Sequence, residues 1–499
     1  MPCAKGALTQ KFPPPEEEKH MAEKQFVTQI ADIDTDFTQW YTDVVLKTQL
    51  VDYGPIKGTM VIRPYGYAIW ENIQREMDAR FKATGHVNAY FPMLIPESLL
   101  KKEAEHVEGF APEVAMVTRA GGQDLAEPCV IRPTSETIIC AMYSKWVNSY
   151  RDLPLKINQW ANVVRWEKTT RPFLRTSEFL WQEGHTIHAT REEAVDETLT
   201  MLHLYADFAK DVLAMPTFIG RKSEKEKFAG AEETYGMEAM MLDGKSLQAG
   251  TSHHFGQKFS RAYDIQFLDK DGTHKYVWQT SWGTSTRLIG GLIMAHGDKR
   301  GLVLPPMVAP VQVVIVPVAA HKPGVTEACE AIEAELKAAG VRVTLDNRDQ
   351  SPGWKFNEWE MKGVPLRFEV GPRDIENGVV TYCKRYDNEK AVISREGIAA
   401  ATVEMLKQIQ QAMYEKSLAF RDAHVRVCNT LEEIGQALDD KCFAKIVWDE
   451  DPAGEALLKE KYQATVRVML EHETPFQDTC SITGNKCDKP VVTLVARAY

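Results

Sequence analysis

Ionisable side chains interrupt two stretches that otherwise read as apolar strands, QWANVVRW (159–166) and EFLWQEGHTIH (178–188). Because side chains alternate along a strand, Arg165 and Glu167 share one face, and Glu183 and His185 share a face of the second stretch. Ionised groups on half-buried strands are costly unless they are paired or bind a ligand. The segment therefore indicates either an Arg–Glu ladder on a solvated sheet face or the floor of a site for an anionic ligand.

A second polar group, Thr134 and Glu136, follows a predicted strand and precedes an apolar helical run over 138–146. A Thr or Ser followed closely by Glu at a helix start is typical of a capping arrangement. The same two side chains could instead face a ligand, and the local pattern leaves both interpretations open.

Polar side chains also surround Gly250 in LQAGTSHHF (247–255), namely Gln248, Thr251, His253 and His254. The two histidines suggest a metal, but neighbouring residues of a strand point to opposite faces. Contacts with a polar ligand are therefore favoured over a two-histidine metal site.

A fourth group lies in VWQTSWGTSTRLIGG (277–291), where small residues and Arg287 open an apolar helix expected over 288–296. Small residues permit close approach of a ligand, and a helix N-terminus favours negative charge. An arginine at that position opposes the helix dipole unless an anion lies nearby. The pattern indicates an anion-binding helix start.

The elements that position these groups can be predicted from periodicity. The segment 159–188 predicts two strands joined by a charged loop too long for a tight turn. Ile69, Ile73, Met77 and Phe81 recur every four residues and predict a long helix that ends at Gly85. The stretch 21–58 is amphipathic, with Phe26, Ile30, Ile33 and Phe37 at near-helical spacing. An apolar strand is expected over 87–95 and a helix over 191–215.

The last third of the chain alternates apolar strands and helices, which predicts an α/β arrangement. The run VQVVIVPV (311–318) is continuously apolar, as in a strand covered on both faces. Further strands are expected at 341–345, 366–370, 379–382, 391–394, 444–448, 465–470 and 491–495, with helices at 324–339, 354–362 and from about 396.

Composition sets broad limits on the class of protein. A length of 499 residues suggests roughly three domains. The net charge of −11 argues against a general polyanion binder, although a local patch could still bind nucleic acid. We expect no signal peptide and no membrane span, and nine scattered cysteines fit reduced thiols in a cytosol.

Three short motifs in order carry a resemblance to class II aminoacyl-tRNA synthetases. Gly85 with Phe91-Pro92 resembles motif 1, Arg165-Trp166-Glu167 with its loop and Phe179 resembles motif 2, and Gly283 to Arg287 resembles motif 3. With RPTSE, WQEGH and QAGTSHH interleaved, the set resembles the prolyl-tRNA synthetases of the eukaryote-like (archaeal-type) architecture.

The resemblance implies a fold and a division into domains. We expect an α+β catalytic domain with an antiparallel sheet over 21–305, an α/β anticodon-binding domain over 306–415 and a small α/β domain over 416–499. Residues 1–20 are expected to form a mobile tail. The family is homodimeric and cytoplasmic, binds no membrane, and joins L-proline to its tRNA with ATP and Mg²⁺ through prolyl-adenylate.

The resemblance also implies roles for individual residues. Arg165 would hold the α-phosphate and the proline carboxylate, and Arg287 the γ-phosphate, so these two arginines carry the catalysis. The remaining proline-site candidates are Thr134, Glu136, Phe110, Trp181, Glu183, His185, His253 and Ser285. The remaining ATP-site candidates are Glu167, Gln248, Thr251 and Thr286. Candidates for contacts with the anticodon bases are residues 352–356, Arg367, Glu369 and Arg373. The family ends in a tyrosine whose carboxylate packs near the active site, and Tyr499 matches it.

One feature departs from the family. Many eukaryote-like members hold a structural zinc with four cysteines, which takes closely spaced cysteine pairs. Here Cys428, Cys442, Cys480 and Cys487 form no such pair, and 448–454 contains no cysteine. We therefore expect a C-terminal domain without zinc.

Two alternatives remain. A threonine enzyme would need Cys and His zinc ligands in its pocket, and none stands at matching positions. A catalytically dead paralogue that binds only tRNA or a partner would have no need to retain both Arg165 and Arg287.

Overall fold

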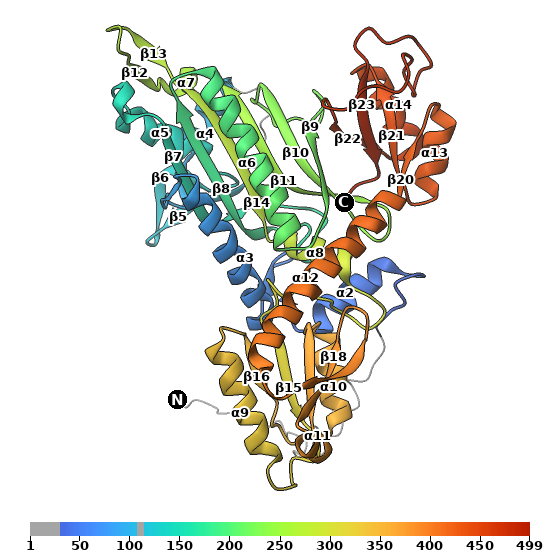
Figure 1. The fold of residues 1–499 in the computed structure, drawn as a ribbon. Coiled ribbons are helices and arrows are strands. Elements are labelled where there is room, and N and C mark those ends of the chain that lie inside the picture. The colour runs from blue at the N-terminus through green and yellow to red at the C-terminus, as the bar shows by residue number, and fades with distance from the viewer. Residues whose placement is uncertain (1–29, 107–113) are drawn as a thin grey trace, which may run out of the picture.

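The computed structural model describes residues 30–106 and 114–499, and its centre is a long sheet that runs through most of the molecule (Figure 1). The eleven strands of this sheet follow the order β20-β21-β23-β22-β9-β10-β11-β14-β8-β7-β3. The predicted N-terminal tail and Phe110 lie outside the described residues.

The part of the sheet that carries the polar motifs is antiparallel. Its strands are β7 (Leu155–Val164), β8 (Glu178–His188), β9 (Thr217–Arg221), β10 (Glu233–Met240), β11 (Ser246–Gly256) and β14 (Trp278–Ser285). The two strands predicted within 159–188 are confirmed as β7 and β8, which pair with Gln159 opposite Glu183. The WQEGH segment lies on β8 and the QAGTSHH segment on β11, and both strands pair with β14.

Helices cover this sheet because each has one apolar stripe. α6 (Arg191–Asp211) starts at a capping box between Thr190 and Glu193 and crosses β11 and β14. α3 (Pro64–Ala83) buries Ile69, Ile73, Met77 and Phe81, the predicted stripe. Gly85 follows α3 with a φ of +85°, a left-handed conformation that glycine adopts without steric cost. Both helix predictions are confirmed.

Two predictions near the N-terminus were wrong. The stretch 87–95 is not one strand but two, β3 (Val87–Asn88) on the long sheet and β4 (Leu94–Pro96) on a three-stranded sheet, because Pro92 interrupts the ladder. Ile30 and Ile33 precede the helix rather than belonging to it. The helix is α2 (Phe37–Lys47), and a hairpin of β1 (Val51–Tyr53) and β2 (Met60–Ile62) follows.

The smaller elements complete the catalytic part. They are α4 (Glu97–His106), β5 (Ala115–Ala120), β6 (Gln123–Ile131), α5 (Glu136–Trp146), the 3-10 helix η1 (Tyr150–Asp152), α7 (Lys258–Tyr263), β12 (Gln266–Leu268), β13 (His274–Tyr276) and α8 (Arg287–His296). α5 and α8 begin at two of the predicted polar groups, so their first turns border the site.

A separate five-stranded sheet, ordered β16-β15-β17-β18-β19, forms the lower body in Figure 1. Its elements are β15 (Val313–Pro317), α9 (Val325–Ala338), β16 (Val343–Leu345), α10 (Pro352–Met361), β17 (Leu366–Val370), α11 (Pro372–Asn377), β18 (Val379–Lys384), β19 (Lys390–Ser394) and α12 (Ile398–Ala423). Every residue of β15 is buried, as its unbroken apolar run predicts. The α/β prediction is confirmed, and the short helix α11 was not predicted.

The last segment adds strands to the long sheet. Its elements are β20 (Val425–Val427), α13 (Leu431–Asp439), β21 (Phe443–Trp448), α14 (Pro452–Tyr462), β22 (Thr465–Met469) and β23 (Val491–Ala496). β22 pairs with β9 at Met469 and Arg221, so the C-terminal strands continue the central sheet. A C-terminal α/β unit was predicted, but its sharing of one sheet was not. Among the described residues, no helix is long and apolar enough to cross a membrane.

Candidate active site

The polar motifs surround one cavity of about 270 Å³ on a face of the sheet. The cavity lies between the start of α5, strands β8, β11 and β14, and the loop after β9. The sequence-predicted residues in its wall are Thr134, Glu136, Arg165, Trp181, Glu183, Gln248, Thr251, His253, Ser285 and Arg287. The ligand-site interpretation is therefore favoured over an ion-pair ladder on a solvated face.

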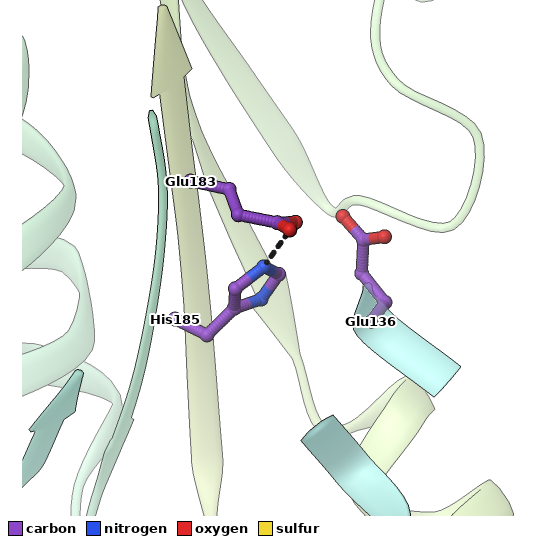
Figure 2. A group of neighbouring side chains, drawn as sticks. All are labelled: Glu136, Glu183 and His185. Carbon is purple, nitrogen blue, oxygen red and sulfur yellow. Dashed lines mark hydrogen bonds and ion pairs between the residues drawn. The ribbon is translucent and has the colours of Figure 1, made fainter. Parts of the chain in front are cut away.

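One end of the cavity holds two carboxylates and a histidine that approach one another (Figure 2). Glu183 Oε2 lies 3.1 Å from His185 Nε2, and both side chains are buried. Glu136 faces them from the first turn of α5, with its ligand-type oxygen within 4.8 Å of theirs. His185 lies beneath Glu183 rather than in the cavity wall.

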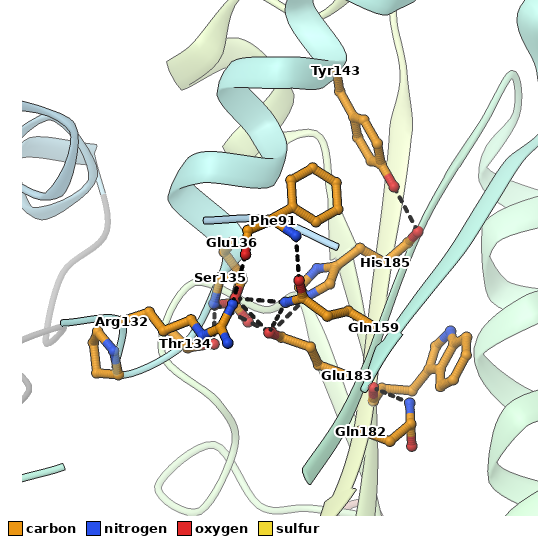
Figure 3. Close-up of polar contacts among 12 residues, drawn as sticks. Phe91, Arg132, Thr134, Ser135, Glu136, Tyr143, Gln159, Gln182, Glu183 and His185 are labelled. Atoms are coloured by element: carbon orange, nitrogen blue, oxygen red, sulfur yellow. Dashed lines mark hydrogen bonds and ion pairs between the residues drawn. The ribbon is translucent and has the colours of Figure 1, made fainter. Parts of the chain in front are cut away.

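A hydrogen-bond network fixes Glu183 (Figure 3). Gln159 Nε2 donates to Glu183 Oε1 at 2.9 Å, and the Ser135 hydroxyl donates to the same oxygen. The Ser135 backbone N–H donates to Glu183 Oε2 at 3.2 Å. Gln159 is itself held by the Phe91 N–H. Glu183 is thus a carboxylate with several donors, which is the arrangement that stabilises its ionised form.

Thr134 and Glu136 do not form a helix cap, which was one of the two interpretations that the sequence left open. Ser135 occupies the N-cap position of α5 without a side-chain capping bond, and the Thr134 hydroxyl donates to the Glu136 carboxylate. The pair instead presents a hydroxyl and a carboxylate to the cavity, which suits a ligand that carries N–H donors.

The charge states at this end follow from burial and hydrogen bonding. Burial raises the pKa of Glu136; His185 opposes this rise and Glu183 adds to it. For Glu183, burial is outweighed by the His185, Ser135 and Gln159 hydrogen bonds, which lower its pKa. For His185, burial is outweighed by the Glu183 hydrogen bond and the Glu136 charge, which raise its pKa. These shifts favour the charged forms of His185 and Glu183, beside a second carboxyl that gains from a cation.

These three side chains are also the described residues most suited to grouping around a metal ion. Their oxygens, however, already accept bonds from Ser135, Gln159, His185 and Thr134. A metal would have to displace those donors. The arrangement is better matched to an ammonium group than to a metal ion.

Two arginines face the other end of the cavity. Arg165 Nε donates to Pro133 O at 3.0 Å, and its guanidinium lies 5.5 Å from the ring centroids of Phe179 and Trp181. Arg287 Nε donates to Leu174 O at 3.1 Å. Each guanidinium therefore keeps further N–H donors, and the aromatic rings hold Arg165 in place.

The electrostatics of these arginines call for an anion. Burial lowers the pKa of Arg165, and Glu136, Glu183 and Glu167 oppose this fall. Burial, together with the positive charges of Arg165 and Arg175, lowers the pKa of Arg287. A negatively charged ligand between the two guanidiniums relieves both the desolvation and the mutual repulsion.

His253 belongs to a wall that the loop after β9 completes. Its Nδ1 lies 3.0 Å from Thr234 Oγ1, and its ring centroid lies 4.9 Å from that of Phe228. Burial, with the neighbouring His185 charge, lowers the pKa of His253 to about 3, so its ring is neutral. His254, the next residue, points to the other face and stacks on Trp278, as the alternation of strand side chains predicts.

Three predicted site residues lie outside the cavity wall. Glu167 is in the loop after β7 and pairs with Arg175 at 3.5 Å. Thr286 is buried at the start of α8. His185 supports Glu183 from below. Phe110 is outside the described residues.

Sequence reasoning missed several wall residues, namely Glu226, Phe228, Thr234 and Ser281. Phe179, which was predicted only as part of motif 2, also lies in the wall. Ser281 is four positions before the predicted Ser285 on β14, so strand periodicity could have identified it. Glu226 and Phe228 lie in a loop with no periodicity, and no local signal distinguishes them.

Family models match three parts of the chain. Residues 117–296 match the class II core domain of tRNA synthetases (G, H, P, S and T), residues 312–405 an anticodon-binding domain, and residues 431–499 the C-terminal domain of prolyl-tRNA synthetases. The first match contains the described cavity wall.

Similar proteins match nearly the whole chain. A proline–tRNA ligase of Alkaliphilus oremlandii is 57% identical over 96% of this chain and 99% of its own, and proline–tRNA ligase 2 of Clostridioides difficile is 55% identical over the same shares. A crystal structure of prolyl-tRNA synthetase from Cryptosporidium parvum, complexed with halofuginone and AMPPNP, is 41% identical. It covers 94% of this chain and 99% of its own, with a TM-score of 0.88.

Proposed function

The chain belongs to the prolyl-tRNA synthetases, and we propose how its cavity divides proline from ATP. It is a class II aminoacyl-tRNA synthetase that ligates L-proline to tRNA with ATP, through prolyl-adenylate. What remains to be assigned is the role of each side chain. The pairing of a carboxylate end with an arginine end in one cavity supports the assignment that follows.

Proline binds at the carboxylate end. Its secondary ammonium carries two N–H donors, and the Thr134 hydroxyl oxygen and the Glu136 carboxylate are acceptors at that end. The bound cation stabilises the ionised form of Glu136, whose pKa burial raises. Trp181 and the His253 ring wall the apolar proline ring, and Ser285 lies in the same wall.

ATP binds at the arginine end. We assign Arg165 to both the proline carboxylate and the α-phosphate, and Arg287 to the γ-phosphate, since both guanidiniums line the cavity. Gln248 and Thr251 add neutral oxygens to this wall. We assign Glu167 to the adenine and place Thr286 behind Arg287, at the buried start of α8.

The chemical step needs positioning more than proton transfer. The proline carboxylate is already ionised and attacks the α-phosphorus in line, the carboxylate–phosphorus bond forms, and pyrophosphate leaves with the bonding electron pair. In the second step the ribose hydroxyl of tRNA attacks the prolyl carbonyl, and the adenylate phosphate accepts its proton as AMP leaves. Mg²⁺ enters with ATP as part of that substrate and neutralises phosphate charge.

Replacing Arg165 by Ala tests this assignment. The change removes a donor to both substrates, so we expect at least a ~100-fold loss in proline-dependent pyrophosphate exchange, comparable to the loss of an oxyanion donor. Arg119→Ala, on exposed β5, is the matched control and retains full exchange. If exchange in Arg165→Ala stays within threefold of wild type, the assignment of Arg165 is wrong. If exchange by the wild type depends on threonine, or on no amino acid, the choice of proline as substrate is wrong.

Homodimer formation is also proposed, at the β3 edge of the long sheet. Within the described chain β3 ends that sheet, and Val87, Tyr90, Met93 and Leu94 around it are exposed. Contiguous exposed apolar side chains favour a protein interface. Sedimentation of the wild type as a dimer, and of Tyr90→Asp as a monomer, tests this proposal.

The 312–405 domain is proposed to read the anticodon of tRNA(Pro). Arg367 lies 4.3 Å over the Phe356 ring and pairs with Glu369, so these side chains form a platform of stacking and charged groups. Residues 352–356 begin α10 beside it, and Arg373 lies at the start of α11.

A cytoplasmic location is also proposed for the protein, since each cysteine of the described residues is free.

A further inference from the structure

The loop 222–231, which forms part of the cavity wall, contacts the C-terminal domain as well as the catalytic sheet. This loop joins β9 to β10 and supplies Glu226 and Phe228 to the wall. Ser223 Oγ donates to Glu455 Oε1 of α14 at 3.0 Å in a buried contact. A second contact comes from Arg467 of β22, which approaches Glu226.

Arg467 is at the centre of a buried ionic group. Its Nη2 lies 3.0 Å from Glu238 Oε1, and its Nε lies 3.2 Å from Glu238 Oε2. Lys222 Nζ binds the same carboxylate at 2.5 Å, and the Lys222 and Glu238 side chains have no exposed surface. Ser246 donates to Glu238 from β11. The group therefore links the start of the 222–231 loop to β10, β11 and β22.

The electrostatics of this group extend to the loop. Burial lowers the pKa of Lys222 and the Arg467 charge adds to this fall, while the carboxylates of Glu238 and Glu226 oppose it. Glu226 Oε2 also lies 3.9 Å from Arg467 Nη1. Because Glu226 is on the loop, its attraction to these two basic side chains helps to hold the loop in place, together with the Ser223–Glu455 hydrogen bond.

The loop in turn sets the wall at the proline end. Phe228 N donates to Thr234 Oγ1 at 3.0 Å, and that oxygen also contacts His253 Nδ1. The Phe228 and His253 rings pack in a tilted arrangement, with their centroids 4.9 Å apart and an interplanar angle of 44°. Phe228 is two residues from Glu226 on the same loop. A displacement of Glu226 would therefore move the Phe228 ring away from His253.

We propose that Arg467 is a positioning residue for proline binding: through Glu226 it fixes the loop whose Phe228 packs on His253. The C-terminal domain thus completes the amino-acid end of the cavity. The inference rests on the assignment of His253 to the proline end proposed above.

The test compares four variants in proline- and ATP-dependent pyrophosphate exchange. In Arg467→Met we expect the KM for proline to rise on the order of 10-fold, while the KM for ATP stays within twofold. Arg467→Lys keeps the charge and recovers most of the proline KM. Glu226→Gln raises the proline KM, and the double variant Glu226→Gln with Arg467→Met is no worse than Arg467→Met alone, since both act through one contact.

Arg221→Ala is the matched control. Arg221 is the neighbour of Lys222 and bridges the same two domains, at 2.6 Å to Glu450 and 2.7 Å to Glu471, but neither carboxylate lines the cavity. We expect a comparable loss of thermal stability with an unchanged proline KM. Hydrogen exchange of the 222–231 peptide should accelerate in Arg467→Met and not in Arg221→Ala.

Two results would overturn the inference. The first is an unchanged proline KM in both Arg467→Met and Glu226→Gln. The second is a rise of the proline KM that is matched by the ATP KM in Arg467→Met and is equally large in Arg221→Ala. If Arg467→Met fails to fold, the exposed-side variant Glu226→Gln decides alone. Failure of the site assignment is distinguishable, because His253→Ala would then leave the wild-type proline KM unaltered.

Discussion

Glu183 and His185 lie on the same face of β8, with their carboxylate and imidazole 3.1 Å apart and both side chains buried. Two ionisable groups this close titrate as a pair. The hydrogen bonds of Glu183 lower its pKa despite burial, and its partner raises the pKa of His185 despite burial. Because the pKa of Glu183 is lowered and that of His185 is raised, the stability that the pair contributes is lost toward both acidic and alkaline pH.

The first prediction follows from the sign of each shift. The contribution of His185 is fully present below its ordinary pKa of 6.5 and is lost as pH rises through its raised folded value. The contribution of Glu183 is present above its ordinary pKa of 4.5 and is lost as pH falls through its lowered value. We expect His185→Gln to lower the free energy of unfolding most between these ordinary values, by about 3 kcal/mol, and less at higher pH.

Urea unfolding of wild type and His185→Gln at several pH values checks this prediction. His188→Gln is a control of opposite sign, because burial lowers the pKa of His188 to about 4. The stability that the neutral His188 ring gives falls as pH drops below 6.5, so the difference from wild type should grow toward alkaline pH. A flat difference for His185→Gln across the whole range would show that the pair is not ionised.

The second prediction concerns the selection of proline over alanine. Alanine lacks two methylenes of the ring, and each missing methylene is worth only about 1–3 kcal/mol of discrimination. We therefore expect alanine-dependent pyrophosphate exchange at a low but measurable rate. The chain between β8 and β14 consists of α6, β9, β10, β11, α7, β12 and β13, all parts of the catalytic fold. Purified Ala-tRNA(Pro) incubated with the enzyme should hence survive, and its rapid deacylation would contradict this.

Arg165 and Glu226 illustrate which site residues can be predicted from the sequence and which cannot. Arg165 interrupts an apolar strand, so the cost of burying its charge marks it in the sequence. Glu226 lies in a polar loop where a charge is unremarkable, and only its approach to Arg467, far along the chain, gives it meaning. The pairing of β22 with β9 is hidden for the same reason, since strand patterns specify a face and not a partner.

The third prediction concerns the C-terminus. The Tyr499 N–H donates to Ser246 O at 3.1 Å, its hydroxyl donates to Asp243 at 2.6 Å, and its ring lies 5.6 Å from the guanidinium of Arg171 in the loop after β7. These contacts involve the backbone, ring and hydroxyl, so the expected role of the terminal carboxylate stays a prediction. Tyr499 nevertheless contacts the loop that follows Arg165, through Arg171.

Deleting Ala498 and Tyr499 should lower aminoacylation about 10-fold while the melting temperature changes little, because Tyr499 is on the surface and the Arg497 contacts with Leu438 and Asp439 remain. Tyr499→Phe removes only the bond to Asp243 and serves as the control. Full aminoacylation by the truncated chain would remove the idea.

The last prediction is that the C-terminal domain folds without zinc. Cys480 N donates to Asn485 O at 2.7 Å and Cys487 N to Asp478 O at 2.9 Å, so the two cysteines close a short loop. Burial, with Cys480 and Asp449 nearby, raises the pKa of the Cys487 thiol to about 11. A zinc ligand must be a thiolate, and this environment favours the thiol.

The segment where the family places its first cysteine pair is satisfied by protein contacts. Asp451 caps α14 through the Ala453 and Gly454 N–H groups, and Asp449 accepts the N–H groups of Asp488 and Lys489. Around it Ile446, Trp448, Val466 and Val495 belong to one apolar cluster with the four cysteines. Packing and backbone hydrogen bonds thus occupy the place of a metal whose binding contributes on the order of 10 kcal/mol in small zinc domains.

We expect metal analysis of the purified enzyme to find far less than one zinc per chain, and prolonged EDTA treatment to leave the thermal transition and aminoacylation unchanged. The double variant Cys480→Ser with Cys487→Ser should lose about 1–3 kcal/mol of stability, the cost of burying two hydroxyls in place of thiols. That loss should be the same with and without added zinc. Stoichiometric zinc whose removal unfolds the domain would overturn the prediction, because thiolate ligation would then outweigh the burial that raises the Cys487 pKa.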